Sequence, residues 1–374
     1  MNKIIVITSN IAPYRRQWCE ELSKFFDVTI VYTKDHDYER DDRWLQKESK
    51  TCKIIKLKND KDKYDPLCFD VIDVIKENKD ALIIFDGYGN KTNLLGLLYC
   101  KFKRRISFTN VDGYPLGEKE NKLKDNIKKS IISKICTYFF CSSEATKNHL
   151  IENGADSNKI TVHNFSSIKE SEIINKLPDY EEKMNIRKEL GIESNKQIVM
   201  SVGAFIPRKR YEDLITAVIN CKTDCDLYLV GGKPTEEYLK LSKDSNKIHY
   251  IDFVLPKEVY KYYLASDLFV LPSQTDVWGL VINEAMAQGL PVISSDNCVA
   301  SKSLVDGNGV IYQTGNIEEL TKAIDKCLNS ENNKKMSERS LEIIHSFTIE
   351  NMVRLQLPAI EEYFNVRKDS NYER

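Results

Sequence analysis

The chain has 374 residues, of which 41% are hydrophobic and 30% are charged, and its formal net charge is −1. This length is too great for one typical hydrophobic core and predicts two domains. The apolar runs are far shorter than the roughly 20 residues of a membrane-spanning helix, which excludes a bundle of such helices. The near-neutral charge gives no general attraction for nucleic acid, so nucleic acid is not an expected partner.

The amino-terminal sequence enters a strand-like run, residues 4–7, without the layout of a signal peptide. We therefore expect a cytoplasmic protein. The cysteines are scattered and mostly lie in apolar surroundings, which predicts buried, reduced thiols. Cys221 and Cys225 are spaced closely enough for a metal site, but no second pair accompanies them, so no metal is expected there.

The first half of the chain alternates short apolar runs with longer, charged helical patterns. The expected strands are residues 4–8, 28–32, 52–57, 81–85, 106–109, 138–141 and 160–163. Helical patterns fall between them, for example at residues 17–25 and 144–153. Strands that alternate with helices predict a parallel sheet with both faces covered.

The same pattern restarts after a polar, charge-rich bridge, residues 169–196. The expected strands are then residues 198–203, 226–230, 248–251, 268–271, 292–295 and 309–312, with helices at 211–220, 257–265 and 317–328. Two doubly wound α/β domains, residues 1–170 and 171–347, would bring their strand ends to a cleft. A last helical pattern begins at residue 348, and the sequence leaves open whether this C-terminal helix, about 348–374, packs back on the first domain.

Polar loops follow several strands of the first half. The loop after the first strand contains Asn10, Pro13, Tyr14 and Arg15. Asp86 and Asp112 each follow a later strand, and Asp112 could orient a hydroxyl or act as a base. Polar recognition is one interpretation of these loops, and ordinary surface turns are the other.

Lysine and arginine dominate between Lys101 and Lys134, and isoleucine and leucine recur at helical spacing within this stretch. A basic amphipathic face at Lys119–Lys134 can bind an anionic membrane surface, where each cation contributes about 1 kcal/mol. The alternative is a helix that buries its isoleucines in the core and leaves its lysines in water.

Two carboxylates stand eight positions apart in the run from Asp276 to Pro291. Gly279 stands between Asp276 and Glu284 and opens an expected helix, which a glycine and a proline close. Acidic groups near the start of a helix can hold hydroxyls while the free backbone N–H groups bind an anion. A nucleotide-sugar offers both, whereas an ordinary amphipathic helix with solvated acids would show the same spacing.

A basic turn follows the expected strand that ends at Gly203. Arg208 and Lys209 lie there, just before a helix, and fixed cations at such a turn suit a diphosphate. A solvated basic loop is the alternative.

Together, residues 203–210, 253–273, 276–291 and 306–309 resemble the family-4 retaining glycosyltransferases of the GT-B fold, which have two Rossmann-like domains facing across a cleft. In the first domain, residues 13–15 and 110–113 are similar to members that build capsular, exopolysaccharide or lipopolysaccharide chains. The resemblance implies a nucleotide-sugar site in the second domain and an acceptor site in the first.

For the donor, the resemblance implies that Glu284 holds the ribose hydroxyls and that Lys209 binds phosphate. Asp276 stands where a glutamate usually contacts the donor sugar, and its side chain is one methylene shorter. Ala204 replaces the usual arginine, and Arg208 is the candidate for the missing charge. Backbone groups complete the implied donor site: Gly203, Gly279 and Leu280 near the sugar and phosphates, and Phe253 and Val254 near the base.

For the acceptor, the resemblance points to Asn10, Pro13, Tyr14, Arg15 and Asp86. Many members place a histidine in the first-domain cleft, and Asp112 is the nearest candidate here.

The implied activity is transfer of a sugar, with retention, from a UDP-sugar to a hydroxyl of a surface-glycan or lipid-linked acceptor. It needs neither metal nor other cofactor, and the enzyme would lie in the cytoplasm, peripheral on the inner face of the membrane. A nucleotide-sugar 2-epimerase of the same fold and a non-catalytic nucleotide-sugar-binding scaffold remain alternatives.

Overall fold

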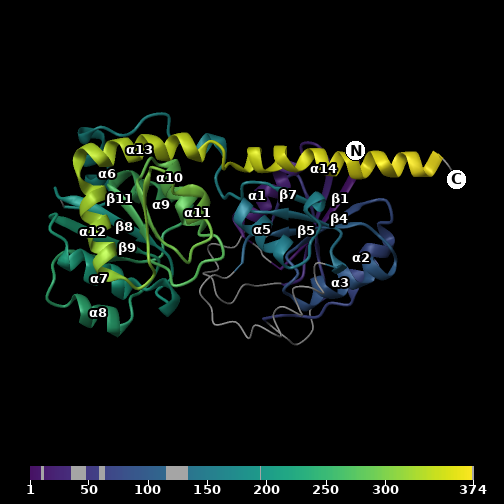
Figure 1. Ribbon diagram of the computed structural model, residues 1–374, viewed down its shortest axis with the longest axis horizontal. Helices are drawn as coiled ribbons and strands as arrows, with labels where there is room; N and C mark the ends of the chain where they lie inside the picture. The colour runs from purple at the N-terminus through teal and green to yellow at the C-terminus, as the bar shows by residue number, and fades with distance from the viewer. Residues whose placement is uncertain (10–11, 35–47, 59–63, 115–133, 194, 373–374) are drawn as a thin grey trace. The chain divides into compact units, whose positions relative to one another are not determined.

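The computed structural model of the protein describes residues 1–374 except 10–11, 35–47, 59–63, 115–133, 194 and 373–374 (Figure 1). The chain forms two compact units. Of the described residues, those within 1–113, 134–167 and 348–372 belong to the first unit, and Tyr114 and those within 168–347 belong to the second. The chain therefore enters the second unit near Ile168 and returns to the first near Thr348.

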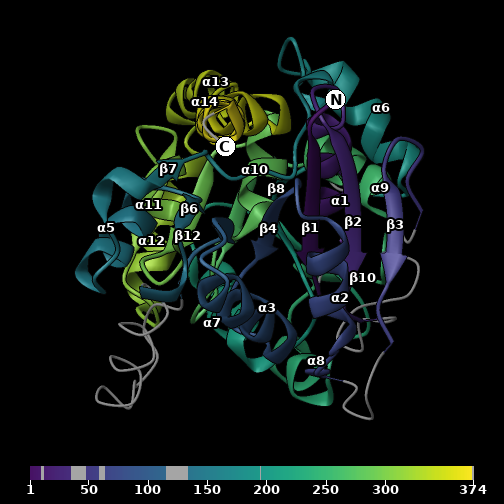
Figure 2. The same ribbon diagram turned by 90° about the vertical axis from the view of Figure 1, so that its right-hand side faces the viewer.

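The described part of the first unit contains a seven-stranded parallel sheet in the order β3-β2-β1-β4-β5-β6-β7. Its strands are β1 (Lys3–Thr8), β2 (Asp27–Tyr32), β3 (Lys53–Lys56), β4 (Leu82–Asp86), β5 (Ser107–Val111), β6 (Tyr138–Cys141) and β7 (Ile160–Val162). Figure 2 shows β3, β2, β1 and β4 side by side in this order. Since β1 pairs with both β2 and β4, the order reverses at β1 and β4.

Both faces of this sheet are buried, as the continuous apolar strands predict. Ile5 and Ile7 of β1 belong to the core formed with α2 (Asp70–Glu77), α3 (Lys91–Phe102) and α5 (Glu144–Glu152). Side chains alternate along a strand, so Ile4 and Val6 point to the other face. Helices α1 (Pro13–Leu22) and α14 (Ile349–Tyr372) lie against each other in this unit.

The C-terminal helix α14 is tied to the first unit by buried contacts. The indole Nε1 of Trp18 in α1 donates a hydrogen bond to Oε1 of Gln356 at 2.8 Å. The rings of Phe26 and Phe364 stack with centroids 6.0 Å apart. Figure 1 shows α14 running past α1 and β7. The last residues of the chain thus cover a sheet formed by its first residues.

The described part of the second unit repeats the design with a six-stranded parallel sheet in the order β10-β9-β8-β11-β12-β13. Its strands are β8 (Gln197–Val202), β9 (Cys225–Val230), β10 (Ile248–Ile251), β11 (Leu268–Leu271), β12 (Val292–Ser295) and β13 (Gly309–Tyr312). Its α-helices are α6 (Tyr180–Glu189), α7 (Tyr211–Asn220), α8 (Glu236–Ser242), α9 (Pro256–Ala265), α10 (Leu280–Ala287), α11 (Ser301–Leu304), α12 (Ile317–Leu328) and α13 (Ser330–Ile344).

The two faces of this second sheet carry different helices. Val199 and Leu227 belong to the core shared with α7 and α12, whereas Ile198 and Tyr228 pack with residues of α6 and α9. The predicted fold class, two doubly wound parallel α/β domains, is confirmed. Within the described ranges, no helix is both long enough and apolar enough to span a membrane.

Candidate active site

The candidate site of the second unit lies at the carboxyl ends of β8 and β11, which are paired neighbours (Leu268 with Val199). The strand order of the sheet reverses between these two strands, the position where open α/β sheets bind ligands. The loop after β8 carries Lys209, and the loop after β11 carries Asp276 and leads into α10. The topology therefore brings the two predicted donor-binding segments together.

Lys209 and Asp276 form an ion pair. The ammonium Nζ of Lys209 lies 2.7 Å from Oδ2 of Asp276, and Lys209 is only 7% exposed. The exposed Arg208 places its guanidinium 3.6 Å from the same oxygen. The backbone N–H of Gln274 donates to the carbonyl of Arg208 at 2.7 Å, which joins the two loops directly. One carboxylate thus lies beside a buried and an exposed cation.

Gly203 makes room for the lysine. Its φ is +150°, a conformation that side chains rarely adopt, and a Cβ there would lie 3.2 Å from Cε of Lys209. The hydroxyl of Tyr211, the first residue of α7, donates to the carbonyl of Gly203 at 3.2 Å. The glycine predicted at the strand end is therefore required for Lys209 to lie against the backbone.

Gly279 allows α10 to begin close to β11. It has φ +98°, and a Cβ at this position would lie 2.8 Å from Sγ of Cys298 and 2.9 Å from a methyl carbon of Leu271. The half-buried Leu280 is the first residue of the helix. The first N–H groups of an α-helix have no partner inside the helix, and together they attract an anion. The start of α10 thus offers donors near the Lys209–Asp276 pair, since the loop from Asp276 leads directly into it.

Glu284 lies in the second turn of α10 and is held by a tyrosine that the sequence did not reveal. The hydroxyl of Tyr263, a fully buried residue of α9, donates to Oε2 of Glu284 at 3.1 Å. Burial raises the pKa of Tyr263, and the negative charge of Glu284 raises it further. Tyr263 therefore stays a neutral donor at physiological pH and orients the half-buried carboxylate.

Tyr211 and Tyr263 lie near both carboxylates of the site. Burial raises the pKa of Tyr211, and the charge of Asp276 contributes to the same shift. Tyr211 in turn acts electrostatically on Tyr263, which contacts Glu284. A buried tyrosine thus acts electrostatically on each carboxylate of the site, Tyr211 on Asp276 and Tyr263 on Glu284, and the signal that could have found them was the tyrosines at buried positions of α7 and α9.

Phe253 and Val254 lie farther along the sheet. They follow β10, the edge strand, which is separated from β8 by β9. Both side chains are half-buried. Their role at the base of a nucleotide remains a prediction.

The predicted polar residues of the first unit form a cluster. Arg15 of α1 is 1% exposed, and its Nη2 lies 2.7 Å from Oδ1 of Asp86 and 2.6 Å from Oδ2 of Asp112. The hydroxyl of Thr8 donates to Oδ2 of Asp86 at 2.6 Å. These residues follow or end β1, β4 and β5, which are neighbours in the sheet. Arg15 is therefore a buried charge shared by two carboxylates and not a surface arginine.

The two carboxylates of this cluster differ. Asp86 is 8% exposed in its side chain, and burial raises its pKa to about 6, with a further contribution from the charge of Asp112. Arg15 and the Thr8 hydroxyl act in the opposite direction. Asp112 is 26% exposed. The pair thus combines a carboxyl that titrates near neutral pH with a more accessible one.

The remaining acceptor candidates flank Arg15. Pro13 is the first residue of α1, where a missing N–H costs nothing. Tyr14 packs edge-on against Phe165 with ring centroids 5.7 Å apart. Asn10 lies outside the described residues. The expected membrane-binding segment also lies outside them, except for its last residue, Lys134, which is exposed.

A buried histidine also lies in the first unit, directly after β7. The side-chain amide of Gln356 in α14 donates to Nδ1 of His163. Burial lowers the pKa of His163 to about 3, with a smaller effect from Arg15. This histidine is neutral at physiological pH, and its position at a strand end was the signal that could have singled it out.

Comparisons with known proteins find similar sequences among glycosyltransferases. Residues 182–342 match the family model for glycosyl transferases group 1. An uncharacterised glycosyltransferase of Haemophilus influenzae is 28% identical over 290 residues, which cover 75% of this chain and 76% of that protein. A lipopolysaccharide core biosynthesis glycosyltransferase of Rhizobium meliloti is 31% identical over 145 residues, which cover 38% of this chain and 42% of that protein.

Solved structures of similar fold cover almost the whole chain. Sucrose-phosphate synthase of Thermosynechococcus elongatus has a TM-score of 0.77 at 17% identity, over 98% of this chain and 100% of its own. The HepE protein of Anabaena, solved with UDP, has a TM-score of 0.76 at 16% identity, over 97% of this chain and 100% of its own. Its structure with UDP-glucose has a TM-score of 0.73 at 16% identity, over 96% and 99%. The fold is that of the GT-B glycosyltransferases, and residues 182–342, most of the second unit, are similar to glycosyl transferases group 1.

Proposed function

We propose that this protein is a family-4, retaining, metal-independent glycosyltransferase. It moves a sugar from a nucleoside diphosphate, most simply UDP, to a hydroxyl of a surface-glycan or lipid-linked acceptor. The observation that carries the proposal is the ion pair between the buried Lys209 and Asp276 where the loop into α10 begins. The UDP and UDP-glucose complexes of the Anabaena protein and the lipopolysaccharide role named for the Rhizobium relative support the choice of donor and acceptor.

Each donor residue has a distinct task in this proposal. Lys209, Arg208 and the first N–H groups of α10 hold the diphosphate and stabilise the charge that develops as it leaves. Glu284, oriented by Tyr263, accepts hydrogen bonds from the ribose hydroxyls. Asp276 accepts a hydrogen bond from a hydroxyl of the donor sugar. The acceptor's proton passes to the departing phosphate, so the transfer needs no protein nucleophile.

Acceptor recognition is assigned to the cluster of Arg15, Asp86 and Asp112 in the first unit. Two carboxylates held by one buried arginine provide fixed acceptors for sugar hydroxyls. The proposed place of action is the cytoplasmic face of the membrane, where a lipid-linked acceptor would be presented.

Donor turnover in Lys209→Met and Glu284→Gln tests the proposal. Both variants should lose at least about tenfold in kcat/KM for a UDP-sugar, since each removes a charged hydrogen bond worth about 1.5–3 kcal/mol. Lys188→Met, which removes an exposed lysine of α6, should behave like the wild type. Wild-type turnover in both site variants would overturn the assignment.

A nucleotide-sugar 2-epimerase is the second candidate, because Asp86 has a pKa of about 6 and lies beside Asp112, as an acid/base pair requires. Incubation with UDP-sugars in the absence of acceptor separates the two. A transferase returns the donor unchanged or slowly hydrolysed, whereas an epimerase produces a new nucleotide-sugar.

A further inference from the structure

A cavity of about 680 Å³ lies in the first unit at the edge of the sheet where the strands begin. Its lining comes from the residues just before and at the start of β5 and β6, the ends of α2 and α3, and residues 359–367 of α14. Arg15, Asp86 and Asp112 lie at the other edge, where parallel strands end. This cavity is therefore separate from the proposed acceptor cluster, and its volume is in the range of small-molecule sites.

The floor of the cavity is aromatic. Phe108 and Tyr138 stack with ring centroids 4.6 Å apart, and Tyr363 of α14 meets Phe108 edge-on at 6.0 Å. Two aliphatic side chains remain exposed in the lining, Ile106 at 44% and Val366 at 60%. Exposure of apolar surface to water is unfavourable, and an apolar ligand that covers this surface would be stabilised by burying it.

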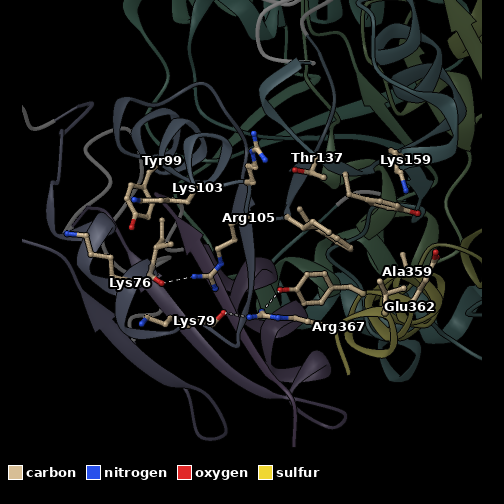
Figure 3. A pocket seen from close by; sticks show the side chains of 17 residues that line it. Lys76, Lys79, Tyr99, Lys103, Arg105, Thr137, Lys159, Ala359, Glu362 and Arg367 are labelled. Carbon is tan, nitrogen blue, oxygen red and sulfur yellow. Dashed lines mark hydrogen bonds between the residues drawn. The ribbon is translucent and has the colours of Figure 1, made fainter. Parts of the chain in front are cut away.

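The rim is strongly cationic. Among the residues that the structure describes, seven lysine and arginine residues line the cavity, and Glu362 is the one acid that accompanies them. Lys103 and Lys159 are exposed rim residues at different ends of the cavity (Figure 3). The protein as a whole is almost neutral, so this local excess of positive charge is a feature of the cavity and not of the composition.

Two of the rim cations have carboxylate partners. Lys76 contacts Asp73 at 3.1 Å, and Arg367 contacts Asp80 at 3.2 Å. Both carboxylates are largely exposed, where ion pairs contribute little. The cationic character of the rim is therefore only weakly offset.

Arg105 is a half-buried cation of the lining. Its guanidinium donates to the backbone carbonyls of Ile75, Asn78 and Ala81 at 2.6–2.7 Å, and it forms no ion pair within the described residues. Its Nε is buried without a hydrogen-bond partner. Burial lowers the pKa of Arg105, and the charge of Asp80 offsets only part of this shift. A bound anion in the cavity would stabilise the guanidinium further.

We propose that this cavity binds an amphipathic anion, one phosphate or carboxylate head group on an apolar body. The head group lies among the rim cations near Arg105, and the apolar body covers Ile106, Val366 and the half-buried ring of Tyr138. A bare inorganic anion would leave Ile106 and Val366 open to water, and a neutral apolar molecule would make no use of the positive charge of the rim. The cationic rim and the apolar lining together favour a ligand that has both an anionic head group and an apolar body. The site is independent of sugar transfer.

Calorimetric titration of the whole protein with dodecyl phosphate below its micelle concentration tests the proposal. We expect binding of one molecule per chain, and at least tenfold weaker binding of inorganic phosphate and of dodecanol. The double variant Lys103→Glu/Lys159→Glu should weaken dodecyl phosphate at least tenfold, and Val366→Ser should weaken it while leaving inorganic phosphate unchanged. Neither variant should change donor turnover.

The matched control is Lys53→Glu/Lys56→Glu, which reverses two exposed lysines on β3 at the far edge of the same sheet. Equal weakening by this control would show a general charge effect and overturn the site. Absence of binding by the wild type would also overturn it. Vesicles containing phosphatidylglycerol form the last arm, and binding to them without binding of monomeric dodecyl phosphate would replace the single-molecule site with bilayer docking. Thermal unfolding of every variant confirms that it is folded.

Discussion

Lys209 and Asp276 are 67 residues apart in the chain, yet the lysine Nζ lies 2.7 Å from the aspartate Oδ2. The pair neutralises a buried ammonium at the place where the proposed diphosphate would bind. A ligand phosphate therefore competes with Asp276 for the same cation. This competition leads to a prediction that separates nucleotide binding from turnover.

Asp276→Asn should bind UDP at least as tightly as the wild type, because the variant removes the carboxylate that holds Lys209. Its kcat for a UDP-sugar should fall about tenfold or more, because the donor sugar loses a charged acceptor. Titration of UDP and steady-state kinetics measure the two effects separately. Loss of UDP affinity together with unchanged kcat would contradict these roles.

Tyr263→Phe should lower kcat/KM for the donor by about tenfold, since Glu284 loses the hydroxyl that orients it at 3.1 Å. Tyr262→Phe is the matched control, because this neighbouring tyrosine of α9 is half-buried and donates no described bond to Glu284. Equal effects of the two substitutions on donor kinetics would argue against a positioning role for Tyr263.

Gly203→Ala should weaken UDP binding about tenfold and destabilise the second unit by about 1–3 kcal/mol, because the residue adopts a strained φ and its Cβ lies 3.1 Å from the Tyr211 hydroxyl and 3.2 Å from Cε of Lys209, which must shift. Gly232→Ala is the control for strain alone. Gly232 also has a positive φ, +125°, but a Cβ there would meet nothing within 4 Å. UDP affinity in Gly232→Ala should stay near the wild-type value, and a similar loss in both would exclude displacement of Lys209 as the cause.

Asp86 should give the first unit a pH-dependent stability. Its folded-state pKa, about 6, is above the ordinary value of 3.8, so the folded state binds more protons than the unfolded state between these values. The contribution of Asp86 to stability is therefore present below about pH 4 and is lost as pH rises to about 6. In urea unfolding, the free energy of unfolding of the wild type should fall relative to that of Asp86→Asn as the pH rises over this interval. Above it, the difference between the two should stay constant. A flat difference for Asp86→Asn over the interval itself would contradict the raised pKa.

The strands of this protein could be predicted closely because buried parallel strands are short apolar runs between polar loops. The run at residues 268–271 is β11 exactly, and residues 52–57 contain β3. The first helix was placed too late, at residues 17–25, because its apolar pattern begins only at Trp18. The structure begins it at Pro13 and buries Arg15 inside, and a buried charge breaks the pattern from which helices are predicted.

The two proposed donor segments could be singled out in the sequence because their residue types follow one another locally: a glycine precedes a basic turn in one, and an acid precedes a glycine and a helix in the other. The support for Glu284 could not, because Tyr263 lies 21 residues earlier on a different helix. The same holds for Arg15, whose partners Asp86 and Asp112 lie 71 and 97 residues later in the chain. Contacts of this kind depend on strand order, which a single sequence does not display.

The packing of α14 on the first unit has a consequence for biosynthesis. Trp18 finds its hydrogen-bond partner in Gln356, 338 residues later. A ribosome that has released the first 167 residues has made every strand of the seven-stranded sheet but not the helix that covers one of its faces. The first unit therefore keeps apolar surface exposed until α14 has been translated. A chain that ended before residue 348 would expose that surface permanently.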